Sequence, residues 1–472
     1  MADLNNKNFV EEKKEELIDN LINYFGREHA ERVKEKVNNT TILVTPKDLN
    51  LLGLPSYPDK IASKYEKFLK ENKLTDEELD DLAEERYIAQ ENENIMTELW
   101  EKKNNKVTSI IQNHFNNPNM DQNLMNQFCS FASVYPEDLK NEIFMTESKK
   151  QMIVNLGKAA GFDLGSDYIS YINNEQFTNL IFDSQVHFDI SVEENRFTNL
   201  AYMQTPSFQS CMKALENINT DENTLMEIKR EVSNYARYGV NGTTLAFQFP
   251  YLDSEDKQMK SVVVLPPKIE CHDSTIYHEF CHVIGTDLIK INPDGSYEYK
   301  SGANVCTKNP ETLKFERSNE VSLSTNETIV EGTANKITEE SKDNPISFPR
   351  TETQKTGYDT SVEFLRPILE DQKEIVEATI TTSDPQVLKR NLGEENLKEL
   401  KQVTEEIDKI NGYALDNYKR EVETKKPNEY SDETKKIIET VKKVEKLNEN
   451  IEINKPLEVK IEPIAEVSKT IS

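Results

Sequence analysis

The stretch Asp273-Ser-Thr-Ile-Tyr-His278-Glu-Phe-Cys-His282-Val-Ile284 decides the fold, because it combines an amphipathic helix pattern with two histidines spaced four residues apart. Asp273 or Ser274 is expected to cap the helix. An apolar face suited to burial is formed by Ile276, Phe280, Val283, Ile284 and Leu288. On such a helix His278 and His282 lie on one side, with Cβ atoms about 6 Å apart.

This spacing lets two imidazole nitrogens share one Zn²⁺ ion. Glu279 is rotated by about 100° from His278, so it can act as general base on a water at the metal. A catalytic zinc needs a third protein ligand. The extended pattern HExxHxxGxxH would need that ligand three residues beyond Gly285, but position 288 is Leu.

The third ligand is therefore expected on a second helix, within Ser324-Thr-Asn-Glu327-Thr-Ile-Val-Glu331-Gly. Ser324 and Glu327 have capping-box spacing, which gives Glu327 a structural role at the helix start. Glu331 follows one turn later among apolar residues, where a carboxylate is costly to bury unless a cation meets it. The sequence favours Glu331 as the ligand and leaves Glu327 as the alternative.

These residues resemble the gluzincin zinc metallopeptidases. The resemblance rests on Ile276-Tyr-His-Glu-Phe-Cys-His-Val-Ile after a Val-rich strand, and on Ile329-Val-Glu-Gly-Thr-Ala, which looks like the Asn-Glu-Gly helix of that group. It implies an upper β-sheet whose edge strand binds peptide, the HExxH helix, and a glutamate-bearing helix below the metal. The chain departs from the group at Val330, where an Asn usually precedes the ligand Glu.

The resemblance implies a zinc-dependent peptidase acting on peptide or protein substrates, with His278, His282 and Glu331 as ligands. By the same resemblance, Tyr358 is the candidate hydrogen-bond donor to the oxyanion. Three alternatives remain open: another zinc hydrolase on the same helix pair, an interaction protein with a vestigial or structural metal site, and a coincidental HEFCH. Glu279 speaks against a structural site, which has no use for a base beside the metal.

Cys271 and His272 precede the motif helix and are expected to be loop residues that lead into it, with a role near the metal as the alternative. Cys281 occupies a variable position of the motif. It is expected to be a small buried hydrophobe that points away from the metal.

Strand-like patterns flank the motif. Gln176–Phe182 and Val186–Ser191 resemble strands, and Thr244–Phe249 with Ser261–Leu265 predicts an antiparallel pair that ends at Pro266 and Pro267. Beyond the motif, Asn292-Pro-Asp-Gly followed by alternating Tyr297 and Tyr299 predicts a hairpin.

The expected fold class is α+β and predominantly helical. Residues 1–175 are expected to form a helical N-terminal domain, in which Thr75 and Glu78 start an amphipathic helix that runs toward Trp100. Residues 176–395 are expected to form a zincin-like metallopeptidase domain with a small antiparallel sheet. Residues 396–472 are expected to form a charged, flexible or partly helical tail, which is rich in Lys and Glu and interrupted by prolines from about residue 420. Residues from about 425 to 472 should add little to the core.

Composition narrows the function classes. The 472-residue chain carries a formal charge of −28, which repels nucleic acid and anionic lipid. It lacks an apolar run of about 18 residues and an evident signal peptide, so a cytoplasmic protein is expected, with leaderless export left open. Five scattered cysteines argue against a disulfide scaffold and favour a reducing compartment. The oligomeric state does not follow from the sequence.

Overall fold

The computed structural model spans the whole chain. It describes residues 8–44, 98, 101–117, 119–132, 139–140, 145, 147–192, 206–238, 246–266, 268, 271–318, 321–348, 358–410, 412–454 and 458–462. The helix expected to start at Thr75 lies outside these residues, apart from Glu98, which is helical. Thr244, Leu245 and Pro267 of the expected strand pair are also outside them.

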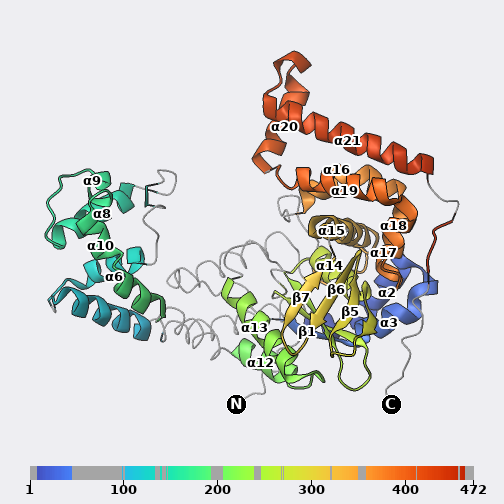
Figure 1. The fold of residues 1–472 in the computed structure, drawn as a ribbon, viewed down its shortest axis with the longest axis horizontal. Helices are drawn as coiled ribbons and strands as arrows, with labels where there is room; N and C mark the ends of the chain where they lie inside the picture. Colours follow the sequence, from blue (N-terminus) through green and yellow to red (C-terminus); the bar gives the residue numbers. More distant parts are fainter. Residues whose placement is uncertain are drawn as a thin grey trace. The chain divides into compact units, whose positions relative to one another are not determined.

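The chain divides into two compact units. Unit 1 comprises Met1–Asp48 and Ser210–Ser472, and unit 2 comprises Leu49–Gln209. This division differs from the expected boundaries at residues 175 and 395, because the first helices pack into the core that also holds the HExxH helix. In Figure 1 the blue helices α2 and α3 lie among the yellow and orange elements of unit 1. Unit 2 is therefore an insertion into unit 1.

The elements of unit 1 are α1 (Phe9–Glu12), α2 (Lys14–Phe25), η1 (Arg27–His29), α3 (Ala30–Asn38), β1 (Thr40–Val44), α13 (Glu222–Tyr238), β2 (Phe247–Leu252), β3 (Met259–Leu265), α14 (Asp273–Ile284), β4 (Thr286–Ile291), β5 (Tyr297–Ser301), β6 (Asn304–Asn309), β7 (Lys314–Arg317), α15 (Leu323–Glu340), α16 (Asp359–Asp371), α17 (Lys373–Thr381), α18 (Val387–Leu392), α19 (Glu394–Ile407), α20 (Gly412–Thr424), η6 (Pro427–Glu429) and α21 (Asp432–Asn454). Unit 2 holds α6 (Gln122–Ala132), α8 (Glu147–Ala159), α9 (Tyr168–Ile172) and α10 (Glu175–Ile181). Helix α12 (Pro206–Leu215) crosses the division between the units.

The two strand-like runs of unit 2 are helices, so that part of the prediction is wrong. The side chain of Asn174 accepts the Phe177 N–H and caps α10. Asp183 likewise accepts the Val186 N–H at the start of a helix over 184–192. These caps place Phe177 and Ile181 four residues apart on one buried helix face. A cap and a four-residue apolar spacing outweigh β propensity here.

A three-stranded sheet of order β1-β3-β2 lies in unit 1. Strands β2 and β3 are antiparallel, with Phe249 opposite Val262, which confirms the predicted pair. Strand β1 joins β3 in parallel, with Thr40 opposite Ser261. The sheet is therefore mixed and brings together segments far apart in the chain.

A second, antiparallel sheet has the order β4-β5-β6-β7. Its first hairpin turns at Asn292-Pro-Asp-Gly, with Gly295 at a φ of 81°, and pairs Ile291 with Tyr297. The predicted hairpin is confirmed. Together with the mixed sheet and the many helices, it makes the chain α+β.

Helix α14 lies in the core of unit 1 and packs against α3, α15, β2 and β3. Every residue of α14 except His282 is buried. The helix ends at Ile284, with Gly285 as its C-cap. Leu288, expected to continue the apolar face of the helix, instead lies in β4, where the chain enters the hairpin.

The charged C-terminal part is packed, which corrects the expectation of a tail that adds little to the core. Helix α21 runs along α16, α19 and α20, as Figure 1 shows in red and orange. Its buried apolar residues are Ile437, Val444, Leu447 and Ile451. Their helical spacing puts them on one face while the Lys and Glu residues occupy the other, so the overall composition conceals an amphipathic helix.

Candidate metal centre

Helix α14 presents both motif histidines on one side. The ring centroids of His278 and His282 are 4.9 Å apart, and their Nε2 atoms are separated by 3.2 Å. The predicted helix is confirmed, but its start differs from the prediction: His272 is the N-cap. The Asp273 carboxylate instead accepts the N–H groups of Ile346 and Ser347 at 3.3 and 2.5 Å, which ties the helix start to a later loop.

Helix α15 supplies a carboxylate to the two histidines. Glu327 Oε2 lies 3.2 Å from His278 Nε2 and 3.2 Å from His282 Nε2. His278, His282 and Glu327 form a group whose donor atoms all lie within 4.8 Å of one another and could hold a metal ion. The structure thus corrects the third position of the group from Glu331 to Glu327.

The reason for the correction is where α15 begins. Its N-cap is Ser322, whose hydroxyl accepts the Thr325 N–H at 3.1 Å. Ser324 therefore does not cap the helix, and Glu327 has no capping role. Glu327 lies one turn inside α15 and faces α14. Two serines two residues apart offer competing caps, and Ser322 rather than Ser324 caps the helix.

Glu331 contacts His278 on the side of the ring away from Glu327. Its Oε2 lies 2.8 Å from Nδ1 of His278, which is the ring nitrogen opposite the one facing Glu327. Glu331 is only 2% exposed. A carboxylate in this position accepts a hydrogen bond from Nδ1–H, and in the neutral imidazole this tautomer leaves the lone pair on Nε2 for a metal. Glu331 is thus brought to the site as an orienting partner of His278.

The donor group lies at the edge of the buried region. The side chains of His278, His282 and Glu327 are 10%, 11% and 13% exposed. A metal held there would keep contact with solvent or substrate, because each of its ligands is partly exposed. A partly exposed three-donor group is typical of a catalytic site, whereas a structural site is closed by a fourth side chain.

Mutual interactions set the ionisation of the group. Burial lowers the pKa of His278, but hydrogen bonds to Glu327 and Glu331 outweigh it and raise the pKa to about 10. Burial raises the pKa of Glu327, yet the charges and hydrogen bonds of His282 and His278 bring it far below its usual range. Without a metal, the cluster therefore favours a protonated His278 imidazole beside an ionised Glu327 carboxylate.

Glu279 follows His278 directly and is 5% exposed. Burial raises its pKa, and the charges of His278 and His282 oppose that shift. A carboxylate with a raised pKa beside a cation site accepts a proton more readily than one in water. The position therefore suits the general-base role predicted for Glu279.

Tyr358 is also brought to the site. Its ring stacks on the ring of His278, with a centroid separation of 6.0 Å and an interplanar angle of 14°. Burial, followed by the charges of Glu327 and Glu279, raises its pKa to about 12. The hydroxyl keeps its proton at neutral pH and can donate a hydrogen bond. Tyr358 is the N-cap residue of α16, just after residues that the structure does not describe.

The cysteines next to the motif are buried side chains. Cys281 is 1% exposed, and burial raises the pKa of its thiol, as expected for a small core residue. His272 forms a bridge to Phe348 at the entry to α14. None of the five cysteines forms a disulfide.

The sequence prediction included Glu327 only as the alternative ligand. The available signal was the dipeptide itself: Asn326-Glu327 is the Asn-Glu pair that the resemblance calls for, one turn ahead of Val330-Glu331.

In the described part of the chain, no helix is long and apolar enough to cross a bilayer. Comparison of the chain with protein-family models, with curated proteins and with solved structures found no match.

Proposed function

We propose that the chain is a zinc-dependent metallopeptidase of the gluzincin type. The observation that carries the proposal is the convergence of His278, His282 and Glu327, whose three donor atoms are 3.2 Å from one another. Donors held about 2.0 to 2.1 Å from a tetrahedral zinc ion would be about 3.3 Å apart. The donor set of two imidazoles and one carboxylate also matches catalytic zinc sites.

The gluzincin assignment gains support from Asn326-Glu327. With Glu327 as the third ligand, an Asn precedes it as in the group, and Thr328 then stands where the group has Gly. The pair of buried helices, α14 with the histidines and α15 with the glutamate, fits the arrangement that the resemblance implies.

Zinc bound by these residues would supply Lewis acidity toward a water molecule and a substrate carbonyl. Glu279 takes the proton from the attacking water and delivers it to the leaving amine nitrogen. Glu331 holds the His278 ring in the tautomer that presents Nε2. Tyr358 donates its hydroxyl proton in a hydrogen bond to the oxyanion that forms on the scissile carbonyl.

The proposed substrates are peptides or unfolded proteins. We place the enzyme in a reducing compartment, with the cytoplasm as the first choice, because none of its five cysteines forms a disulfide.

The test is metal analysis of the purified protein combined with hydrolysis of a mixed peptide library. We expect one equivalent of zinc and cleavage that stops on chelation and returns with added zinc. Glu327→Ala should lose the zinc, since two remaining ligands hold it poorly. Glu339→Ala is the matched control, because this exposed glutamate is on the same helix. A wild-type protein that binds zinc but cleaves no peptide would favour another zinc hydrolase or an interaction protein. A protein that binds no zinc would refute the proposal.

A further inference from the structure

The turn between β5 and β6 contacts both helices that carry the donor atoms. The Gly302 N–H donates to the Gly285 carbonyl at 3.0 Å, at the end of α14. The Ala303 N–H donates to Asn326 Oδ1 at 2.8 Å, near the start of α15. Asn326 immediately precedes Glu327. Two adjacent backbone amides thus link the end of the histidine helix to the residue next to the glutamate.

The fit between the turn and the helices is close. Gly302 has a φ of 57°, and a Cβ atom at this position would lie 2.2 Å from Asn326 Oδ1. A Cβ atom on Gly285 would lie 3.3 Å from the Gly302 nitrogen. Gly302 therefore requires glycine, because of its positive φ and its contact with the Asn326 side chain, and Gly285 fits tightly against the turn. Any displacement of the turn is therefore passed to both helices.

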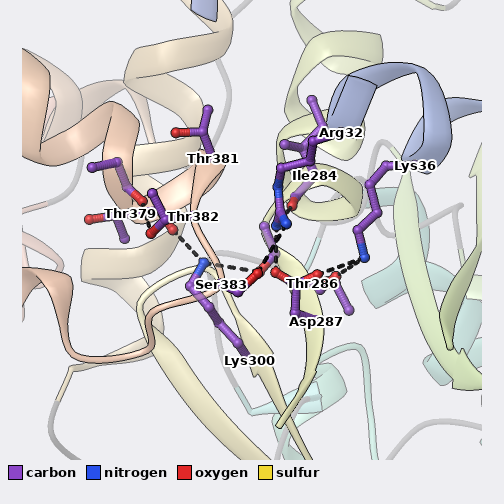
Figure 2. Close-up of polar contacts among 12 residues, drawn as sticks. Arg32, Lys36, Ile284, Thr286, Asp287, Lys300, Thr379, Thr381, Thr382 and Ser383 are labelled. Atoms are coloured by element: carbon purple, nitrogen blue, oxygen red, sulfur yellow. Dashed lines mark hydrogen bonds and ion pairs between the residues drawn. The ribbon is translucent and has the colours of Figure 1, made fainter. Parts of the chain in front are cut away.

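Lys300, two residues before the turn, strengthens the contact with α14. Its side chain is fully buried, and its Nζ donates to the carbonyls of Gly285 at 3.3 Å and Thr379 at 2.6 Å. Figure 2 shows Lys300 extended between the end of α17 and the region of Asp287. Burial, and then the nearby charge of Arg32, lower the pKa of Lys300 to about 7.

An apolar side chain would fill the same space without the cost of burying an amine. What the amine adds is hydrogen bonding to the C-terminal carbonyls of two helices at once. Those carbonyls carry the negative end of each helix dipole, which partly offsets the burial of a cation. The lysine therefore fixes the end of α14 rather than filling a gap.

Helix α3 holds the same end of α14 from another side. Arg32 Nη2 donates to the Ile284 carbonyl at 2.6 Å and pairs with Asp287 Oδ2 at 2.5 Å. Lys36 pairs with Asp287 Oδ1 at 2.9 Å and also donates to the Thr286 carbonyl. Figure 2 shows Arg32 and Lys36 reaching from α3 toward Asp287 and its neighbours. The end of α14, just after His282, is thus anchored to α3 through the Ile284 carbonyl and through the first residues of β4.

We propose that the β5–β6 turn is a positioning element of the metal centre, and that Lys300 and Asn326 set through it the separation of His282 and Glu327. The inference rests on the proposed zinc site. His282 is three residues before Gly285, and Glu327 is next to Asn326, so the two ligands from different helices are linked by Gly302 and Ala303. Metal sites need ligand placement within about 0.5 Å, and a rigid link across the two helices supplies it.

Cobalt(II) is the probe, because its visible absorption is intense in four-coordinate sites and weak in six-coordinate ones. Asn326→Ala removes the acceptor of the Ala303 N–H, and Lys300→Met removes the amine while filling its space. Each should raise the cobalt dissociation constant about tenfold, the lower end of the range for residues that support ligands, and should weaken the visible band. The matched controls are Asn335→Ala on α15 and Lys290→Met, whose side chain is 54% exposed on β4. Both controls should keep the wild-type constant and spectrum.

The outcomes separate this inference from the proposed function. If the wild-type chain binds no cobalt or zinc, the proposed function and this inference fail together. If the wild-type chain binds cobalt and folded Asn326→Ala keeps its affinity and spectrum, the positioning inference alone is overturned. Circular dichroism establishes folding, and Lys300→Met decides the same question if Asn326→Ala does not fold.

Discussion

Glu331 Oε2 lies 2.8 Å from Nδ1 of His278, while Nε2 of the same ring faces Glu327 at 3.2 Å. One imidazole is thus held between two carboxylates of one helix, spaced four residues apart. The two carboxylates have different roles, and single substitutions distinguish them.

Glu331→Ala should weaken zinc binding without abolishing it, because three ligands remain and only the orientation of His278 is lost. We expect the zinc affinity to fall 10- to 100-fold, measured by competition with a chromogenic chelator. Glu339→Ala, on an exposed part of the same helix, should leave the affinity unchanged. Complete loss of zinc from folded Glu331→Ala would return the ligand role to Glu331.

Glu279→Ala should keep zinc stoichiometry near that of the wild type, because this residue is outside the donor group. Peptide hydrolysis should fall by about 10² to 10⁴ in kcat, the usual contribution of a general base. His278→Ala should instead lose both zinc and activity. Full turnover by Glu279→Ala would rule out the proposed mechanism even with zinc present.

Stability should depend on pH through Lys300. Its pKa is about 7 in the folded chain, against a usual value of 10.5. Between these values the unfolded chain binds more protons than the folded chain, so the free energy of unfolding rises with pH across this window. Below about pH 7 Lys300 is protonated in both the folded and the unfolded chain. Its contribution to the free energy of unfolding is then constant and least favourable.

Urea unfolding of the wild type and of Lys300→Met between pH 6 and 10 measures this effect. The difference between the two proteins isolates Lys300 from other titrating groups. We expect this difference in the free energy of unfolding to change across the window by an amount on the order of a few kcal/mol. A difference that is flat across the window would mean that Lys300 titrates near its usual value.

Ile451→Ala in α21 should destabilise unit 1 by about 2 to 5 kcal/mol, because it removes a core side chain. Ile451 is 1% exposed, whereas Ile453 on the same helix is 80% exposed. Ile453→Ala, the matched control, should change the free energy of unfolding by at most about 0.5 kcal/mol. Equal effects of the two substitutions in thermal unfolding would contradict the packing of α21.

The sequence was most informative where local spacing determines structure. The helix of His278 and His282 and the hairpin around Gly295 follow from residues within a few positions of one another. The prediction of the third ligand depended on which of Ser322 and Ser324 caps α15. Both residues carry the same side chain. Local propensity could not resolve that choice, because tertiary contacts select the register of the helix start.

The contacts that anchor α14 had no local signal at all. Arg32 meets Ile284 across a sequence separation of 252 residues, so neither periodicity nor spacing relates the two. The charged composition of α21 misled for a different reason: residues such as Val444 and Leu447 are few, but they all face the core. Composition averages over faces, whereas burial depends on one face.

The parallel pairing of β1 with β3 also affects the order of folding during synthesis. Thr40 leaves the ribosome long before its partner Ser261. About 220 residues separate the two, which at roughly 5 to 20 residues per second is a delay of about 10 to 45 s. Throughout that interval β1 has an unpaired edge, and Arg32 and Lys36 lack the carbonyls that they bind in the finished chain. During synthesis the segment up to Val44 therefore has to wait for its partners, and α3 can anchor the last turn of α14 only after that delay.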